Sequence, residues 1–427
     1  MKIAVIGGGS TYTPELVDGF IRRRDILPLE ELCLMDIDAD RLKIVGGLAE
    51  RMITAAALPT VVRWTTDRAM AIDGASFVIA QIRVGGMAAR RTDEQLGIRH
   101  GLVGQETTGV GGMAKALRTI PPMLEIAQDM ARLAPDAFQI NFSNPSGLVT
   151  EALLRHSDTP VIGLCNIPWN VRAQIAGWVN APPDEVEMDY VGLNHLSWVR
   201  GVRWRGQDLT ERMVAAYTTE LERDEKTAAA APIARSQRAW LNYYLRYYYF
   251  TARVIKEQQA AKSTRAEEVI EIEKELLALY GKSTLHENPA ILEKRGGAYY
   301  SEAAAALIAD LYDDAGTTHV VNTRNQGAIP NLPEDVVVEI PCRITSAGAT
   351  PVPTEPLAPE MWGLVCAVKA YELLTVRAAV YGDRKAARLA LLAHPLGPDG
   401  DSVDTVLEDL LQTNRHHLPR FFPEAST

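Results

Sequence analysis

A chain of 427 residues is long enough for two or three domains, and 47% hydrophobic with 23% charged residues suits a folded protein with a large core. Its net charge of −10 at pH 7 gives no surplus of positive charge for binding nucleic acid. Apolar runs stay shorter than the roughly 18 to 20 residues that cross a bilayer, and the four cysteines form no CxxC pair. We expect a cytoplasmic protein with reduced thiols and no nucleic-acid or membrane partner.

The first half of the chain alternates short β-branched runs with amphipathic segments. This alternation is typical of βαβ units and a mostly parallel sheet. The runs expected to form strands are 2–6, 32–35, 61–64, 77–81, 138–141 and 161–165, and helices are expected near 14–24, 39–57, 113–133 and 146–156. In such a sheet, functional residues gather beyond the C-terminal ends of the strands.

The pattern changes after residue 165. We expect a strand or hairpin over 188–204, a helix over 266–280, a strand over 336–340 and closing helices over 359–379, 384–392 and 402–414. The alanine-rich stretch 228–232 is interpreted as a loop or linker rather than as a domain boundary. The chain is therefore expected to be an α/β protein with a Rossmann-type domain over residues 1–165 and an α+β domain over residues 166–427.

A glycine loop, Gly7-Gly8-Gly9-Ser10, follows the first expected strand and precedes a helix. Glycine lets the backbone approach a pyrophosphate, and the free amides of a helix start favour an anion. The second strand ends at Asp36, whose carboxylate can bond ribose hydroxyls and repel a 2′-phosphate. We predict that this loop and Asp36 bind NAD, although Tyr12 replaces the third glycine of GxGxxG. Asp38 is expected to be a helix N-cap.

Other polar residues near strand ends allow two interpretations each. Asn144 can cap a turn or face a ligand, Cys165 can be a small core residue or a ligand, and His195 can be a satisfied core histidine or a functional one. The glycine-rich segment 104–112 can be a second anion nest or the hinge of a lid. Most rings of the aromatic run 243–250 are expected to pack in the core or at an interface.

Several longer motifs occur together in one order. They are AVIGGGSTYTPEL (4–16), GQETTG (104–109), SNPSG (143–147), GLCNIP (163–168), GLNHL (192–196), YLRYY (244–248), KRGG (294–297) and VNTRN (321–325). The set covers nearly the whole chain and resembles glycoside hydrolase family 4. This resemblance implies a lactate/malate-dehydrogenase-like fold, NAD, a divalent metal, usually Mn²⁺, and hydrolysis of 6-phospho-β-glucosides by a homo-oligomer, either a dimer or a tetramer.

The resemblance also implies roles for individual residues. Cys165 and His195 correspond to metal ligands, Tyr244 to the catalytic base and Glu106 to an acid that raises the basicity of that tyrosine. The positions implied to bind substrate are Arg91, Asn144, Asn166 and Arg265. In the α-glucosidase branch of the family, an Asp follows the metal-binding Cys and protonates the leaving group. Because Asn166 cannot donate a proton in that way, its presence favours the β branch.

The implied reaction is a cycle of oxidation, elimination, addition and reduction, an exception to the usual two-carboxylate scheme. NAD takes a hydride from C3, Tyr244 removes the C2 proton, the aglycone leaves C1, water adds and the hydride returns. One alternative is a 2-hydroxy-acid dehydrogenase of the lactate/malate type, which would accumulate NADH but has no use for Cys165, His195 or Tyr244. Another is a non-catalytic regulator that senses NAD or binds carbohydrate, which would need no metal pair.

Overall fold

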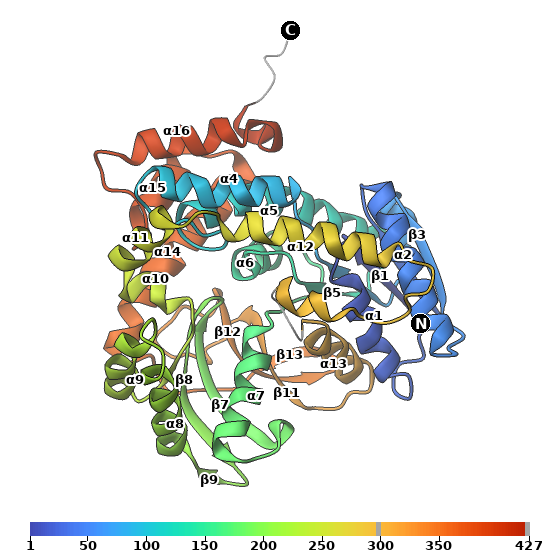
Figure 1. Cartoon of the computed structure of the whole chain (residues 1–427), viewed down its shortest axis with the longest axis horizontal. Helices are drawn as coiled ribbons and strands as arrows, with labels where there is room; N and C mark the ends of the chain where they lie inside the picture. The colour runs from blue at the N-terminus through green and yellow to red at the C-terminus, as the bar shows by residue number, and fades with distance from the viewer. Residues whose placement is uncertain (296–299, 423–427) are drawn as a thin grey trace.

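The computed structural model describes residues 1–295 and 300–422. Within this part of the chain, nine strands form one sheet in the order β13-β12-β11-β6-β5-β4-β1-β2-β3 (Figure 1). The parallel strands are β1 (Lys2–Ile6), β2 (Glu31–Met35), β3 (Val61–Thr65), β4 (Phe77–Ala80), β5 (Phe138–Asn141) and β6 (Val161–Gly163). Their order is that of the Rossmann fold. The predicted fold class is confirmed, as are all six strands, with ends that differ by at most two residues.

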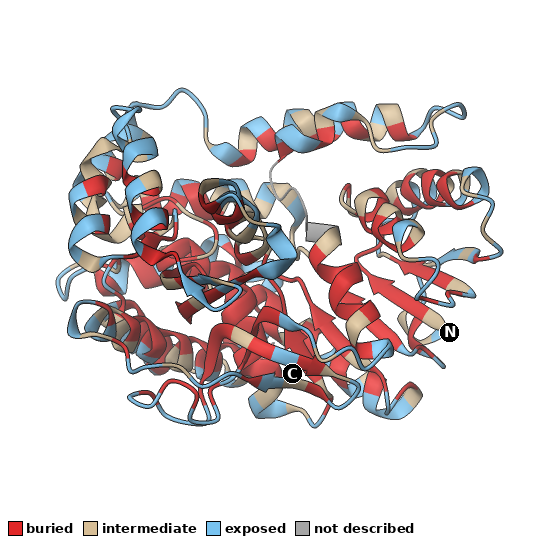
Figure 2. Ribbon diagram, turned by 90° about the horizontal axis from the view of Figure 1, so that it is seen from below, coloured by how far each residue is buried: buried red, intermediate tan, exposed pale blue. Residues whose placement is uncertain are grey.

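The strands of this sheet are apolar because helices cover both faces. Ile3, Ala4 and Val5 of β1 are fully buried, and Figure 2 shows the central strands red along most of their length. The predicted helices form as α1 (Thr13–Arg22), α2 (Ala39–Ala55), α5 (Gly109–Leu133) and α6 (Ser146–His156). Asp38 caps α2 as expected, because its side chain accepts a hydrogen bond from the Arg41 amide at 3.0 Å.

Two helices of this half were not predicted, α3 (Arg68–Ile72) and α4 (Gly86–Arg99). The first is only five residues long. In α4 the buried positions include Asp93 and Glu94, so the helix has no continuous apolar stripe that a sequence pattern could reveal.

The C-terminal half extends the same sheet. Strand β11 (Thr318–Arg324) lies antiparallel to β6, and β12 (Val337–Thr345) and β13 (Gly348–Pro351) continue the sheet outward. The predicted strand near 336–340 is confirmed and is longer than expected. The predicted domain boundary at residue 165 stays a prediction, but strands from both sides of it belong to one sheet.

A second, smaller sheet contains the predicted hairpin, which consists of β7 (Val186–Leu193) and β8 (Leu196–Trp204), with β9 (Gln207–Asp208) and β10 (Trp240–Leu241) pairing with β8. Helices α7 (Ile167–Val179) and α8 (Thr210–Glu222) pack against this sheet, and α9 (Ala231–Gln237) packs against α8. The interpretation of residues 228–232 as a loop or linker is wrong. These residues form η2 (Ala228–Ala230) and the start of α9, where Pro232 occupies the first turn, a position that tolerates proline.

The remaining helices close the structure. They are α10 (Leu245–Tyr249), α11 (Thr251–Ala260), α12 (Arg265–Tyr280), α13 (Tyr300–Tyr312), α14 (Pro359–Tyr381), α15 (Arg384–Ala393) and α16 (Val403–Thr413), with 3₁₀ turns η1 (Pro183–Glu185), η3 (Ala290–Arg295), η4 (Arg415–His417) and η5 (Pro419–Phe421). Helix α12 packs against α2 and α4, and in Figure 1 it runs alongside α4. Gly296 and Gly297 of the KRGG motif lie outside the described residues. Across the described ranges, no helix is both long and apolar enough to cross a membrane.

Candidate active site

A cavity of about 1100 Å³ opens at the C-terminal edge of the large sheet. Gly7 and Ser10, which follow β1, line it together with Gln81, Ile82 and Arg83, which follow β4. Strands β1 and β4 are neighbours at the point where the strand order reverses, which is where ligands bind in open α/β sheets. The volume exceeds the roughly 300 to 1,000 Å³ of an ordinary small-molecule site. It has room for a cofactor and a substrate together.

The glycine loop forms one side of this cavity. Gly7 has φ +91°, and a Cβ there would lie 2.7 Å from the Gln81 carbonyl oxygen, so no larger residue fits. The Gly9 amide donates to Asp36 Oδ2 at 2.9 Å. Asp36 also lines the cavity, and its carboxylate keeps acceptor capacity beyond this bond. Gly8 packs against Leu34 of β2. Of the predicted NAD residues, Gly7, Ser10 and Asp36 therefore line the cavity, whereas Gly8 and Gly9 support the loop from behind through Leu34 and Asp36.

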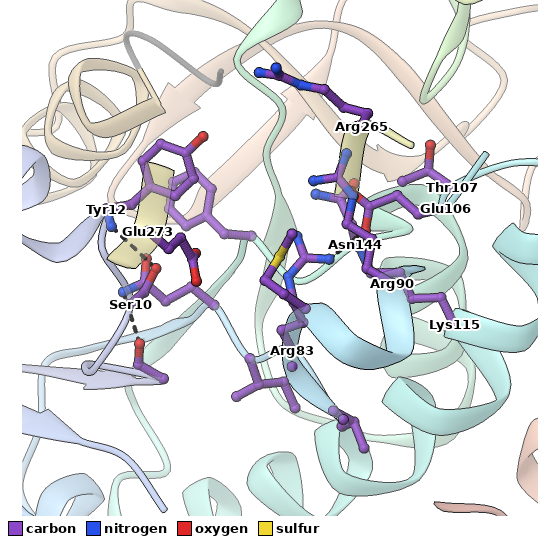
Figure 3. Close-up of a pocket in the computed structure, with 18 of the residues that line it drawn as sticks. Ser10, Tyr12, Arg83, Arg90, Glu106, Thr107, Lys115, Asn144, Arg265 and Glu273 are labelled. Carbon is purple, nitrogen blue, oxygen red and sulfur yellow. Dashed lines mark hydrogen bonds and ion pairs between the residues drawn. The ribbon is translucent and has the colours of Figure 1, made fainter. Parts of the chain in front are cut away.

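A buried ion-pair cluster faces the loop and was not predicted. Glu273 of α12 pairs with Arg295 at 2.5 Å and with Arg41 at 3.1 Å, while Arg41 donates to the Gly9 carbonyl at 2.7 Å. Although burial works against ionisation, the two arginines lower the pKa of Glu273 to about 2. The Arg295 guanidinium lies 3.8 Å from the centroid of the Tyr12 ring. Ser10, Tyr12 and Glu273 appear together on one side of the cavity in Figure 3.

The predicted metal ligands meet beside the cavity. Cys165 follows β6, and His195 lies in the two-residue turn between β7 and β8 with φ 65°. Their side chains are buried, and Cys165 Sγ lies 3.6 Å from His195 Nε2, close enough for one ion to contact both atoms. His195 lines the cavity, so an ion there would also be open to a ligand.

The protonation states of this pair follow from burial. Burial lowers the pKa of His195 to about 3, with Lys115 acting in the same direction, so the imidazole is neutral at pH 7. Burial and the carboxylate of Glu339 raise the pKa of the Cys165 thiol, so binding of a metal would displace its proton. Among the described residues, no group of three or more His, Cys, Asp and Glu side chains could hold a metal. A metal bound at Cys165 and His195 would therefore have two protein ligands, and its other positions would be left to substrate and water.

Tyr244 lies directly against this pair. Its ring stacks on the His195 imidazole with centroids 3.9 Å apart and planes 9° apart. Burial and the neighbouring Tyr247 raise the pKa of Tyr244, and the charge of Glu106 raises it further, whereas Arg90 lowers it. Glu106 therefore acts in the direction expected for an acid that increases the basicity of this phenol.

Glu106 stands in a loop before α5, surrounded by three cations. Its carboxylate pairs with Lys115 at 2.5 Å, with Arg90 at 3.1 Å and with Arg83. Although burial works against ionisation, Arg83, Lys115 and Arg90 hold the pKa of Glu106 well below its usual value. Burial and Arg83 lower the pKa of Lys115 to about 7. Figure 3 shows Arg90, Glu106 and Lys115 together across the cavity from Ser10. One feature of the sequence could have indicated this ion cluster: Lys115 is a charged residue within the mostly apolar stretch that forms the buried part of α5.

Three of the four predicted substrate residues reach the cavity: Asn144, Asn166 and Arg265. The structure does not bring Arg91 to it. Arg91 is exposed on α4, whereas Arg90 lines the cavity and pairs with Glu94 at 2.9 Å. One helical position turns a side chain by about 100°, so adjacent arginines of one helix face different surroundings.

The cavity is positively charged in a chain that is negative overall. Seven arginine or lysine side chains line it against five carboxylates, whereas the chain as a whole carries −10. A local excess of cations favours anionic ligands such as phosphate groups.

Comparisons with known proteins agree with this geometry. The family model described as "Family 4 glycosyl hydrolase" matches residues 2–181, and the model of its C-terminal domain matches residues 190–397. A protein of Bacillus subtilis named "Probable 6-phospho-beta-glucosidase" is 42% identical, over 99% of this chain and 98% of its own.

Solved structures give the same result. The 6-phospho-β-glucosidase of Thermotoga maritima with manganese, NAD⁺ and glucose 6-phosphate has a TM-score of 0.91 and 38% identity, covering 98% of this chain and 99% of its own. Malate dehydrogenase of Plasmodium falciparum, at 15% identity and TM-score 0.52, covering 91% of this chain and 99% of its own, shares the fold alone. The two family models together span most of the chain, which therefore belongs to family 4 of the glycosyl hydrolases.

Proposed function

We propose that this protein hydrolyses 6-phospho-β-glucosides and uses NAD and a divalent metal, Mn²⁺, to do so. One observation carries the proposal: the glycine loop, His195 and the Tyr244 ring stacked on His195 line one cavity, and Cys165 Sγ lies 3.6 Å from His195 Nε2. A relative of 38% identity was solved with manganese, NAD⁺ and glucose 6-phosphate. The excess of cations in the cavity suits both the pyrophosphate and the 6-phosphate.

The residues present fit both groups. Gly7 and Ser10 offer a close backbone approach, and Asp36 offers a carboxylate for ribose hydroxyls. Once the thiol has lost its proton, Cys165 and His195 would offer a soft thiolate and a neutral imidazole, a pair that would hold a metal of the Mn²⁺ type loosely and leave positions for substrate. When bound, NAD would supply a reversible hydride acceptor for the sugar, and the metal would supply a Lewis acid for oxygens of the substrate.

The chain's own residues perform the proton transfers. Once C3 is a ketone, the C2 proton is acidic, and Tyr244 takes it as the phenolate, a form that Arg90 and a cation bound at Cys165 and His195 would favour against the effect of burial. The electron pair of that C–H bond expels the aglycone by breaking the C1–O bond. Water then adds at C1, Tyr244 returns a proton to C2, and the sugar is reduced again at C3, so no net oxidation occurs. Glu106 favours proton uptake by Tyr244 because its negative charge raises the pKa of the phenol.

Asn166 supports the β anomer as substrate. It lines the cavity next to Cys165, where a neutral amide cannot give a proton to a leaving group. An enzyme of this design depends on a leaving group that departs by elimination without a strong acid beside it. Arg265, which starts α12 and lines the cavity, is the proposed partner of the 6-phosphate among the predicted residues.

We also propose a cytoplasmic location and a homo-oligomeric state, either dimer or tetramer. The proposed substrate and cofactor are charged phosphate compounds of the cell interior. Cys33, Cys165, Cys342 and Cys366 are free thiols, which suits a reducing compartment. Light scattering of the purified protein decides the oligomeric state.

The test is release of p-nitrophenol from its 6-phospho-β-glucoside, with NAD, Mn²⁺ and reductant each omitted in turn. We expect release to need all three, the 6-phospho-α-glucoside to react far more slowly, and no NADH to accumulate. Stoichiometric NADH from a 2-hydroxy acid would favour a dehydrogenase instead, and NAD-independent release would contradict the proposal.

A further inference from the structure

We propose that Thr107 is a positioning residue that holds His195 with its proton on Nδ1, so that Nε2 is left to bind the divalent metal. The inference rests on the proposed function of Cys165 and His195 as metal ligands. It depends on a short chain of hydrogen bonds in the GQETTG segment, whose role the sequence left open between an anion nest and a hinge.

The chain begins at Gln105, whose side-chain orientation is fixed by its neighbours. The backbone amides of Thr107 and Thr108 both point at one atom of that side chain, Oε1, the second at 3.2 Å. A backbone N–H can only donate, so this atom must be the carbonyl oxygen and not the amide nitrogen. Gln105 therefore presents an acceptor that cannot donate.

The direction of the Thr107 hydroxyl follows from this. Thr107 Oγ1 lies 2.8 Å from Gln105 Oε1 and 2.9 Å from His195 Nδ1. Because Gln105 Oε1 only accepts, the single hydroxyl proton of Thr107 is directed to it. The hydroxyl oxygen then accepts from His195, and the donor must be Nδ1–H.

A proton on Nδ1 of His195 determines the state of the other ring nitrogen, Nε2. In a neutral imidazole with its proton on Nδ1, the Nε2 atom carries a free lone pair. Nε2 lies 3.6 Å from Cys165 Sγ, on the side where the second proposed ligand stands. Metal-binding histidines usually donate their second N–H to such an outer partner, which fixes ring orientation and tautomer. Thr107 occupies that place here.

The segment that carries Thr107 is itself held firmly. Gln258 of α11 exchanges two hydrogen bonds with the Gly104 backbone, at 2.9 and 2.8 Å. On the other side, Thr108 Oγ1 lies 2.8 Å from Tyr248 OH and 3.1 Å from His394 Nε2. Anchors at both ends favour a fixed support over a hinge. Thr107 therefore stands on a fixed segment from which its hydroxyl can hold the His195 ring.

The variant that tests this is Thr107→Val, which keeps the shape of the side chain and removes its hydroxyl. Thr107→Ser keeps the hydroxyl. Thr159→Val serves as the matched control, because Thr159 is buried and donates to the Ala127 carbonyl at 3.1 Å, in a bond away from the cavity. Mn²⁺ binding is measured by electron paramagnetic resonance titration. We expect Thr107→Val to weaken it about 10-fold or more, and the other two variants to bind as the wild type does.

The second readout needs neither metal nor activity. Long-range ¹H–¹⁵N spectra of metal-free protein labelled at histidine nitrogen report the tautomer, and His195→Asn identifies the signal. We expect the wild type to carry its proton on Nδ1 and Thr107→Val to show a mixture of tautomers.

A wild-type ring protonated on Nε2 would overturn the inference, as would unchanged Mn²⁺ affinity in Thr107→Val. A wild type that binds no Mn²⁺ would instead contradict the proposed function. The tautomer of His195 would still decide whether Thr107 controls the ring.

Discussion

Replacing Tyr244 with Phe removes one hydroxyl group and little else. The ring keeps its stack on His195 at 3.9 Å and its edge contact with Tyr247 at 5.7 Å. A swap that conserves volume in this way costs less than about 1.5 kcal/mol of unfolding free energy. Loss of a general base lowers the rate by about 10²- to 10⁴-fold, which corresponds to about 3 to 5 kcal/mol of activation free energy. The effect should fall on kcat, with NAD and Mn²⁺ binding retained.

The assay for this variant follows hydrogen exchange at C2. Substrate is incubated with enzyme, NAD and Mn²⁺ in D₂O, and deuterium at C2 of the sugar is read by mass spectrometry beside the release of p-nitrophenol. Tyr249→Phe is the control, because this tyrosine belongs to the same aromatic run and its hydroxyl bonds Gln237 at 3.1 Å. Exchange in Tyr244→Phe at the wild-type rate would remove Tyr244 from the role of base.

Three further predictions concern charged and metal-binding groups. Glu106→Gln leaves Arg83 and Lys115 without their anion and leaves Arg90 with Glu94 alone. We therefore expect the free energy of unfolding to fall by about 3 to 5 kcal/mol, seen as a lower urea midpoint; an unchanged midpoint would contradict the ion cluster. The pKa of Glu273 falls from an ordinary value of 4.5 to about 2 in the folded protein, which corresponds to about 3 kcal/mol of unfolding free energy. This stabilisation is present above pH 4.5 and is lost as the pH falls toward 2. The gap in urea midpoint between wild type and Glu273→Gln should therefore shrink between pH 5 and pH 3, and a constant gap would refute the assignment. Cys165→Ser should abolish Mn²⁺ binding. In the wild type, binding of Mn²⁺ would displace the thiol proton, because the pKa of Cys165 is raised. Mn²⁺ affinity should therefore rise about tenfold per unit increase in pH near neutrality, which titrations at pH 6.5 and 7.5 can check.

Sequence patterns correctly predicted the features that are formed by residues close to one another in the chain. The strand of Ile3 to Ile6, the glycine turn after it and the Asp38 cap each involve neighbours in sequence, so propensity and spacing were sufficient. The placement of Asn144 and His195 near one cavity followed from longer motifs that occur in a fixed order.

Other parts depend on contacts between distant segments. Glu273 and Arg41 are 232 positions apart, and their ion pair leaves no periodic trace in either helix. Helix α4 buries carboxylates, so its pattern could not show which of Arg90 and Arg91 faces inward. The antiparallel strand β11 joins a parallel sheet through a single register pair, Asn322 with Gly163, which composition could not reveal. Burial and distant charges, more than local sequence, set these features.

The most direct measurement is hydrolysis of the 6-phospho-β-glucoside in D₂O, once with NAD and once after every trace of dinucleotide has been removed. With NAD and Mn²⁺ we expect the released glucose 6-phosphate to carry deuterium at C2, and without NAD we expect no cleavage. Cleavage at the full rate by the stripped enzyme, with hydrogen retained at C2, would contradict a reaction that passes through oxidation at C3 and proton removal by Tyr244.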